Sequence, residues 1–210
     1  CDPYWGKGAD GISFRRVRFK FEGQILPRVY FYLQPDFTKV VGSSRYIATL
    51  QDAYLDVGLN SKNEYKIRLG QSKLPFGYEI MQSSSERIPL DRSDAINSSV
   101  KGERDFGMYF MWTGQKRKDI MNEIKDKGLK HSGDFGVFAF GFYNGQAANN
   151  TDKNKKFHWL TRISYPFRLG QQILEPSIQA YTGKYVIPQV STGVKAVSYT
   201  HLTLPTNREV

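Results

Sequence analysis

The stretch from Tyr65 to Gly77, YKIRLGQSKLPFG, restricts the fold of this chain more than any other segment. In its first half, large apolar or aromatic residues at positions 65, 67 and 69 alternate with Lys66, Arg68 and a glycine. A period of two residues is typical of a β-strand, whose successive side chains point to opposite faces of the sheet. The segment therefore predicts a strand with one apolar face and one cationic face, ended by its proline and second glycine.

The same division into an apolar and a cationic face occurs near the beginning of the sequence. Val17, Phe19 and Phe21 alternate there with basic residues at positions 16, 18 and 20. The polar face of a strand in a water-soluble sandwich would normally mix both signs of charge with Ser and Thr. Two strands of this polarity instead predict a wall with lipid on one side and a positively charged lumen on the other.

Alternating segments recur along the chain and are separated by turn-forming or polar stretches. A barrel of about eight strands has an interior filled by side chains, where unpaired cations would be costly, whereas a water-filled lumen needs about 16 strands. We therefore predict an all-β fold, an antiparallel transmembrane β-barrel that is present as a fragment with about eight of roughly sixteen strands. The predicted strands are Ile12–Glu22, Arg28–Phe37, Ala48–Leu59, Tyr65–Lys73, Arg104–Trp112, Asp134–Tyr143, Phe157–Tyr165 and Leu174–Lys184.

The predicted connections differ in length, with short turns at one end of the sheet and longer loops, such as Thr38–Arg45, at the other. Phe76–Glu103 shows no sustained period and is too long for a structureless connector in a compact soluble domain. Such a segment can fold into a wide barrel and narrow it, or it can be a solvent-exposed surface loop; the sequence leaves both open. The charged segment Thr113–Ser132 can hold one or two helical turns.

Composition sets further limits. The net charge of +10 implies attraction to anions, which could be small oxyanions, nucleic acid or lipid headgroups. No apolar run reaches the roughly 20 residues of a transmembrane helix. The single cysteine, Cys1, excludes an internal disulfide, and His131 and His158 lack neighbours at metal-ligand spacing. With no nucleotide or hydrolase motif either, we predict no enzyme, no cofactor and no metal site.

Several longer motifs resemble one known family. The segments ISFRRVRFKFEG, YFYLQPDF, LQDAYLDV and IRLGQSKLPFG, between residues 12 and 77, resemble the phosphate-selective porin O/P family, and weaker agreement extends to about residue 184. The resemblance implies a barrel of about 16 strands that passes phosphate or related anions. It further implies a homotrimer in the outer membrane of a Gram-negative bacterium, in contact with the lipid bilayer and lipopolysaccharide, and no nucleic-acid partner.

The candidate anion-binding residues are the cations on the presumed lumen face. Fixed cations at reduced dielectric can replace the hydration of a phosphate, and the planar fork of arginine donates two hydrogen bonds to one oxyanion. Asp52 and Asp56 share this face with two of the cations and can pair with them. The predicted cationic ladder is Arg16, Arg18, Lys20, Lys66, Arg68 and Arg162, with Lys73, Arg87 and Arg92 at or near the constricting loop.

Two other functions remain open at this point. A soluble basic β-domain rich in aromatic residues could bind nucleic acid by stacking bases and contacting phosphates. A structural outer-membrane barrel could carry the same strands without any transport role. Solubility without detergent would favour the first alternative, and the absence of anion conductance in a planar bilayer would favour the second.

The two ends of the sequence suggest that it is a piece of a longer protein. Val197–Thr206, VSYTHLTLPT, can be encoded by GTC TCT TAT ACA CAT CTG ACG CTG CCG ACG, which resembles a translated transposon-type sequencing adapter. We therefore expect residues 1–196 to be a partial porin β-barrel and residues 197–210 to be foreign; a genuine polar C-terminus is the alternative. Because no initiator Met or signal peptide is visible, we expect the natural start to lie upstream.

Overall fold

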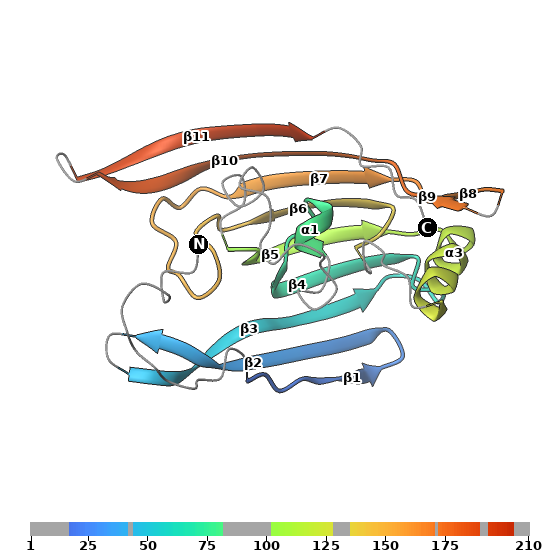
Figure 1. Ribbon diagram of the computed structural model, residues 1–210, viewed down its shortest axis with the longest axis horizontal. Coiled ribbons are helices and arrows are strands. Elements are labelled where there is room, and N and C mark those ends of the chain that lie inside the picture. The colour runs from blue at the N-terminus through green and yellow to red at the C-terminus, as the bar shows by residue number, and fades with distance from the viewer. Residues whose placement is uncertain are drawn as a thin grey trace, which may run out of the picture.

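The computed structural model describes residues 17–41, 44–81, 102–127, 135–170, 172–189 and 193–203. Nine strands form one antiparallel sheet in which almost every strand lies beside its neighbours in the chain (Figure 1). The order across the sheet is β1-β2-β3-β4-β5-β6-β7-β10-β11. The strands are β1 (Phe21–Leu26), β2 (Val29–Val41), β3 (Ser44–Gly58), β4 (Tyr65–Lys73), β5 (Arg104–Trp112), β6 (Phe138–Tyr143), β7 (His158–Ser164), β10 (Ser177–Gln189) and β11 (Gly193–Thr203).

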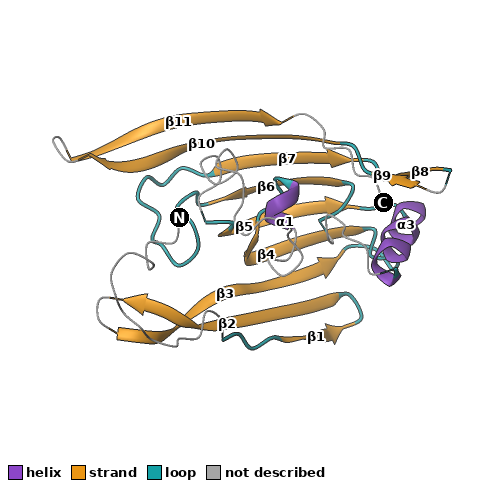
Figure 2. Ribbon diagram, in the orientation of Figure 1, coloured by secondary structure: helices purple, strands orange, loops and turns teal. Residues whose placement is uncertain are grey.

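The remaining elements are small and lie in the connections (Figure 2). A two-stranded hairpin, β8 (Phe167–Leu169) and β9 (Gln172–Leu174), lies between β7 and β10. The short helix α1 (Tyr78–Met81) follows β4, and the longer helix α3 (Gln115–Asp126) follows β5. Neither helix in the described ranges is long and apolar enough to cross a membrane.

The register of the sheet sorts its side chains onto two faces. Phe31 is paired with Leu55, and the same row continues through Leu69 and Met108 to Phe142. The next row begins with Tyr30 and Asp56 and continues through Arg68 and Tyr109. Because neighbouring rows point to opposite faces, one face is apolar and the other carries the charged residues. The predicted all-β, antiparallel fold is confirmed, and within the described residues the sheet is open, with β1 and β11 at its edges.

The apolar face is exposed on the strands from β1 to β7 and on β10. Among the described side chains, large apolar ones lie open on eight strands, with Phe106 at 59% exposure and Phe140 at 43%. A water-soluble monomer rarely shows an apolar patch of more than a few hundred Å², so a face of this kind fits contact with hydrocarbon. The exposed members of this face include Leu33, Leu55, Tyr65, Leu69, Phe106, Trp112, Phe140, Trp159, Ile163 and Ile178.

Substitution of Phe140 by arginine tests this assignment. In a lipid bilayer, we expect Phe140→Arg to lower the free energy of unfolding by about 2–4 kcal/mol, because a cation in the hydrocarbon loses its hydration. Tyr65 is the first residue of β4, beside the turn at 60–63, so Tyr65→Arg should lower the free energy of unfolding by only about 0–1 kcal/mol, as expected near the membrane surface. Urea unfolding of protein in lipid vesicles, followed by tryptophan fluorescence, measures both. Equal effects of the two variants would contradict a buried lipid face.

The other face of the sheet is covered in its middle by the segment that follows β4. Figure 1 shows α1 lying over the central strands. Leu74, Phe76 and Ile80 are almost fully buried there and belong to one cluster with side chains of β5, β6, β7 and β10. The ring of Phe76 meets Tyr181 of β10 edge to face, with centroids 5.2 Å apart. The described beginning of the predicted constriction loop therefore crosses several strands on this face, which we call the covered face.

Two glycines explain how a large tyrosine lies flat on the covered face. A Cβ atom at Gly107 would come within 2.7 Å of the Tyr109 hydroxyl oxygen, and one at Gly141 within 2.5 Å of Tyr109 Cδ1. Tyr109 is fully buried and belongs to the cluster with Phe76. The glycine-rich sequence of Asp134–Tyr143, which obscured the facing of that strand, is thus a consequence of packing on the covered face.

Several predicted boundaries are wrong. The predicted first strand, Ile12–Glu22, is displaced, because β1 begins at Phe21 and continues through the predicted connection at 23–27 to a turn at Pro27 and Arg28. Proline presets the backbone for such a turn, and Leu26 pairs with Val29 across it. The predicted loop Thr38–Arg45 is largely strand, because β2 and β3 remain paired as far as Val41 and Ser44. Residues 12–16 lie outside the described residues.

The predicted difference in loop length between the two ends is also wrong. In an antiparallel sheet, the connection from β5 to β6 is at the same end as the short turns after β1 and β3, and it contains all of α3. At 12 residues, this helix is longer than the one or two turns expected. At the C-terminus, β11 pairs with β10 from Gly193 to Thr203, so the predicted boundary between residues 196 and 197 falls within a strand. The foreign origin of residues 197–210 stays a prediction.

Candidate functional site

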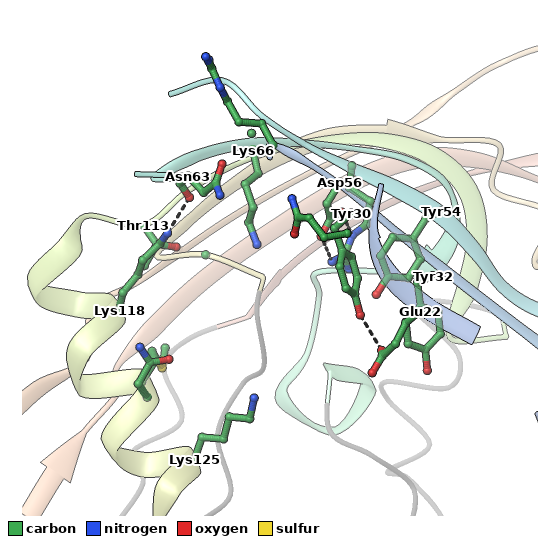
Figure 3. A pocket seen from close by; sticks show the side chains of 17 residues that line it. Glu22, Tyr30, Tyr32, Tyr54, Asp56, Asn63, Lys66, Thr113, Lys118 and Lys125 are labelled. Atoms are coloured by element: carbon green, nitrogen blue, oxygen red, sulfur yellow. Dashed lines mark hydrogen bonds and ion pairs between the residues drawn. The ribbon is translucent and has the colours of Figure 1, made fainter. Parts of the chain in front are cut away.

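A polar pocket lies between α3 and the covered face of β1 to β4, and Figure 3 shows it from close by. Its volume is about 560 Å³. The sheet supplies one wall, the turn after β3 and the start of α3 close one end, and α3 supplies the opposite wall. The lining residues are Glu22, Gln24, Arg28, Tyr30, Tyr32, Tyr54, Asp56, Gly58, Asn63, Lys66, Arg68, Thr113, Lys118, Met121, Asn122, Lys125 and Gly136.

Hydrogen bonds to the β3–β4 turn fix the position of α3. Lys118 Nζ donates to the backbone oxygens of Lys62 at 2.9 Å and Asn63 at 2.7 Å. The first helical N–H, at Gln115, donates to Glu64 Oε1 at 3.1 Å, where a carboxylate is favourable beside the positive end of the helix. Ile124 of the helix is buried. The start of α3 is therefore held against the β3–β4 turn by side-chain hydrogen bonds.

The far end of α3 has a second attachment. Glu123 accepts hydrogen bonds from Lys127, one turn later at 2.7 Å, and from Arg168 of β8. These two hydrogen bonds, first from Lys127 and then from Arg168, lower the pKa of the Glu123 carboxyl. A lowered pKa means that the attachment is present at neutral pH and is lost as the pH falls through the folded-state pKa.

On the sheet wall of the pocket, two stacked aromatic rings lie between two cations. Arg68 donates from Nε and Nη2 to the two carboxylate oxygens of Asp56, each at 2.7 Å. Its guanidinium carbon lies 4.0 Å from the ring centroid of Tyr54, and Tyr54 stacks on Tyr32 with centroids 5.1 Å apart. The ammonium of Lys20 lies 5.6 Å from the Tyr32 ring. Tyr54 therefore has a guanidinium on the β4 side and another ring on the β2 side.

The pocket carries an excess of positive charge. Of the described residues that line it, five are cations and two, Glu22 and Asp56, are carboxylates. Asp56 is held by Arg68, and Glu22 contacts Lys20 at 2.7 Å and accepts the Tyr30 hydroxyl at 2.6 Å. In Figure 3, Lys66 from β4 and Lys125 from α3 extend from opposite walls toward the space between them. A partly enclosed space with net positive charge attracts anions.

Comparison with known proteins identifies the family. The profile described as "Phosphate-selective porin O and P" matches residues 4–209, nearly the whole chain. The chain belongs to the phosphate-selective porin O and P family. Membership in a porin family indicates a channel of the outer membrane, which agrees with the sheet and its exposed apolar face. No curated protein and no solved structure matches the chain.

In the porin, four of the predicted ladder cations lie close to the same edge of the sheet. Lys20, Lys66 and Arg68 are at or beside the pocket. Arg18 lies two residues before Lys20 in the sequence, and its Nε contacts the buried Asp36 carboxylate at 2.6 Å. The pairing of Asp56 with Arg68 was one of the possibilities that the sequence allowed. Arg16, Arg87 and Arg92 lie outside the described residues.

Two predicted cations of the porin lie elsewhere. Arg162 is on the covered face, in the register row of Lys66, but it is only 1% exposed. Its Nη1 donates to the Gly136 oxygen at 2.5 Å and its Nη2 to Glu175 at 2.9 Å. Lys73 is the last residue of β4, at the opposite end of that strand from the pocket. Of the described cations, the structure brings Lys20, Lys66 and Arg68 together and places Arg162 and Lys73 away from them.

Sequence reasoning missed the cations that α3 contributes. Lys118 and Lys125 were seen only as part of a charged segment, although a signal was present. Positions 118, 121, 122 and 125 follow the i, i+3, i+4, i+7 spacing of one helical face, and all four line the pocket of the porin. Arg104 was also missed; its Nε donates to both oxygens of Asp52 at 3.0 Å. Across the described residues, no group of three or more His, Cys, Asp or Glu side chains could hold a metal.

Proposed function

We propose that this porin passes phosphate or related small anions by diffusion, through a lumen lined by arginine and lysine. The observation that carries the proposal is the cationic pocket on the covered face, directly opposite an apolar face suited to lipid. An anion that enters a narrow passage loses part of its hydration, and fixed cations at reduced dielectric offset that loss. The family assignment supports the same cargo.

The cations of this lumen have two different roles in the proposal. Arg68, Arg104 and Arg162 are buried and paired with carboxylates, so they stabilise the wall and contribute little net field. Lys66 of β4 and Lys118 and Lys125 of α3 line the pocket and add positive charge around the space that an anion would enter. Several moderate sites in series suit conduction, because an ion that binds too tightly at one place does not leave.

Other parts of the proposal concern the protein's surroundings. We infer a location in the outer membrane of a Gram-negative bacterium, with lipid and lipopolysaccharide against the apolar face and three copies in one assembly. Lys73, Arg87 and Arg92 remain proposed members of a constriction formed by the segment after β4. The inward course of Leu74–Met81 supports a constriction of that kind.

Planar-bilayer recording tests the proposed transport. With a gradient of potassium phosphate, the reversal potential should indicate a preference for the anion. Lys66→Gln and Lys125→Gln should each reduce the ratio of anion to cation permeability by about threefold or more, since each removes one charge from the pocket wall. Lys116→Gln is the matched control, because Lys116 is on α3 but lines a different, largely apolar groove with Trp112 and Tyr165. A channel that prefers cations would reject the proposal.

A structural barrel without transport is the second candidate. The neutralised arginines and the apolar cluster under α1 favour it, because they fill part of the covered face with fixed contacts. The same recordings decide between the two. Protein that inserts into the bilayer in folded form and gives no current steps would identify the structural role.

A further inference from the structure

We propose that the pocket between α3 and the sheet binds organic phosphates that carry several hydroxyl groups, such as a sugar phosphate. The inference rests on the proposed anion transport and specifies its substrate class. Three observations lead to it: the size of the pocket, the mixture of groups that line it, and the blocked faces of its aromatic rings.

The pocket is larger than an inorganic oxyanion requires. Its volume of about 560 Å³ lies within the roughly 300–1,000 Å³ of sites that hold organic ligands. A phosphate ion at the ammonium of Lys66 or Lys125 would leave most of this space to water. A ligand with a carbon framework can instead span the distance between the sheet wall and the helix wall.

The lining combines cations with neutral and anionic hydrogen-bond acceptors. Gln24 donates one amide hydrogen to the Leu26 oxygen at 2.6 Å, and its side-chain oxygen is a hydrogen-bond acceptor in the pocket lining. Glu22 and Asn122 add a carboxylate and an amide to the same space. The Glu22 carboxylate repels a phosphate dianion, whereas carboxylate and amide groups together match the hydroxyl groups of a sugar. The lysines match its phosphate.

The aromatic residues favour a hydroxylated ligand over a flat one. Tyr54 lies between Arg68 and Tyr32, and Lys20 lies over the Tyr32 ring. Because these neighbours occupy the faces of Tyr32 and Tyr54, a nucleobase has no open face of these two rings on which to stack. The rings present edges and hydroxyl groups to a ligand, and these form hydrogen bonds more readily than stacks.

Titration calorimetry on the full chain in detergent micelles tests the inference, with glucose 6-phosphate and inorganic phosphate as probes. We expect glucose 6-phosphate to bind at least about fivefold more tightly, since each additional hydrogen bond is worth roughly that factor. Lys125→Gln should weaken both probes by about tenfold, because it removes a charged contact. Asn122→Ala should weaken only glucose 6-phosphate, by about threefold to tenfold. Lys116→Gln should change neither.

The outcomes separate this inference from the proposed transport. If glucose 6-phosphate binds no more tightly than phosphate, or if Asn122→Ala affects both probes equally, the sugar-phosphate pocket is rejected. In that case, phosphate current in bilayers would still support the proposed anion transport. If the bilayers show no anion current but calorimetry shows the expected pattern, transport is rejected and the pocket is a binding site alone. Circular dichroism of each variant shows that the sheet remains folded.

Discussion

Asp56→Ala is expected to lower the free energy of unfolding by about 3–5 kcal/mol. The variant leaves the guanidinium of Arg68 without the two hydrogen bonds, each of 2.7 Å, that now compensate its burial. Arg68 is 5% exposed, so little water can take the place of the carboxylate. The stacking of Arg68 on Tyr54 does not offset the loss, because a cation–π contact is worth only about 1–2 kcal/mol.

The matched control is the exposed ion pair between Lys20 and Glu22, at the β1 edge of the sheet. Glu22→Ala removes a contact between side chains that are 51% and 36% exposed, so it should cost less than about 1 kcal/mol. Replacing both members of the buried pair, with Asp56→Leu and Arg68→Met together, should cost less than Asp56→Ala alone. Urea unfolding of vesicle-bound protein measures all three. An Asp56→Ala effect no larger than that of Glu22→Ala would show that water reaches Arg68 freely.

The alternation of residues was enough to predict the strands whose two faces meet different surroundings. β4 and β5 have the bounds that the sequence predicted, Tyr65–Lys73 and Arg104–Trp112. In both strands a run of exposed apolar residues alternates with residues on the covered face, so the period is strong. The first strand was misplaced because the alternation of the sequence already includes Arg18–Lys20, which precede the start of β1 at Phe21. A periodic sequence does not show where pairing with the next strand begins.

The charge pattern predicted which residues share a face but not which charges neutralise one another. Arg104 meets Asp52, 52 positions earlier in the chain, and Arg162 meets Glu175 across the β7–β10 connection. Both contacts depend on long-range packing, which a single sequence does not encode locally. For this reason the predicted cationic ladder overstates the net charge near the centre of the sheet. The excess is instead near α3, whose place on the covered face depends on Lys118 and the turn at 62–63.

The sequence did not decide whether the segment after β4 enters the barrel or lies on the surface. Substitution of Phe76, which anchors the described part of this segment, tests its role. We expect Phe76→Ala to lower the free energy of unfolding by about 3–5 kcal/mol, because the ring is fully buried and its removal leaves a cavity. Gly77 N–H, beside the ring, donates to Gln179 Oε1 of β10, so the anchor also fixes the backbone across the sheet. Phe106→Ala, which removes an exposed ring from the apolar face, is the control and should cost less.

The same variant links stability to conduction. If Leu74–Met81 holds a constriction in place across β5, β6 and β7, loosening Phe76 should raise single-channel conductance and reduce the preference for anions, because the passage becomes wider and ions keep more of their hydration. Phe106→Ala should leave both quantities unchanged. A Phe76→Ala protein that is destabilised as expected but conducts as before would show that the segment is part of the structural core only, and that the passage is narrowed elsewhere, at the pocket under α3.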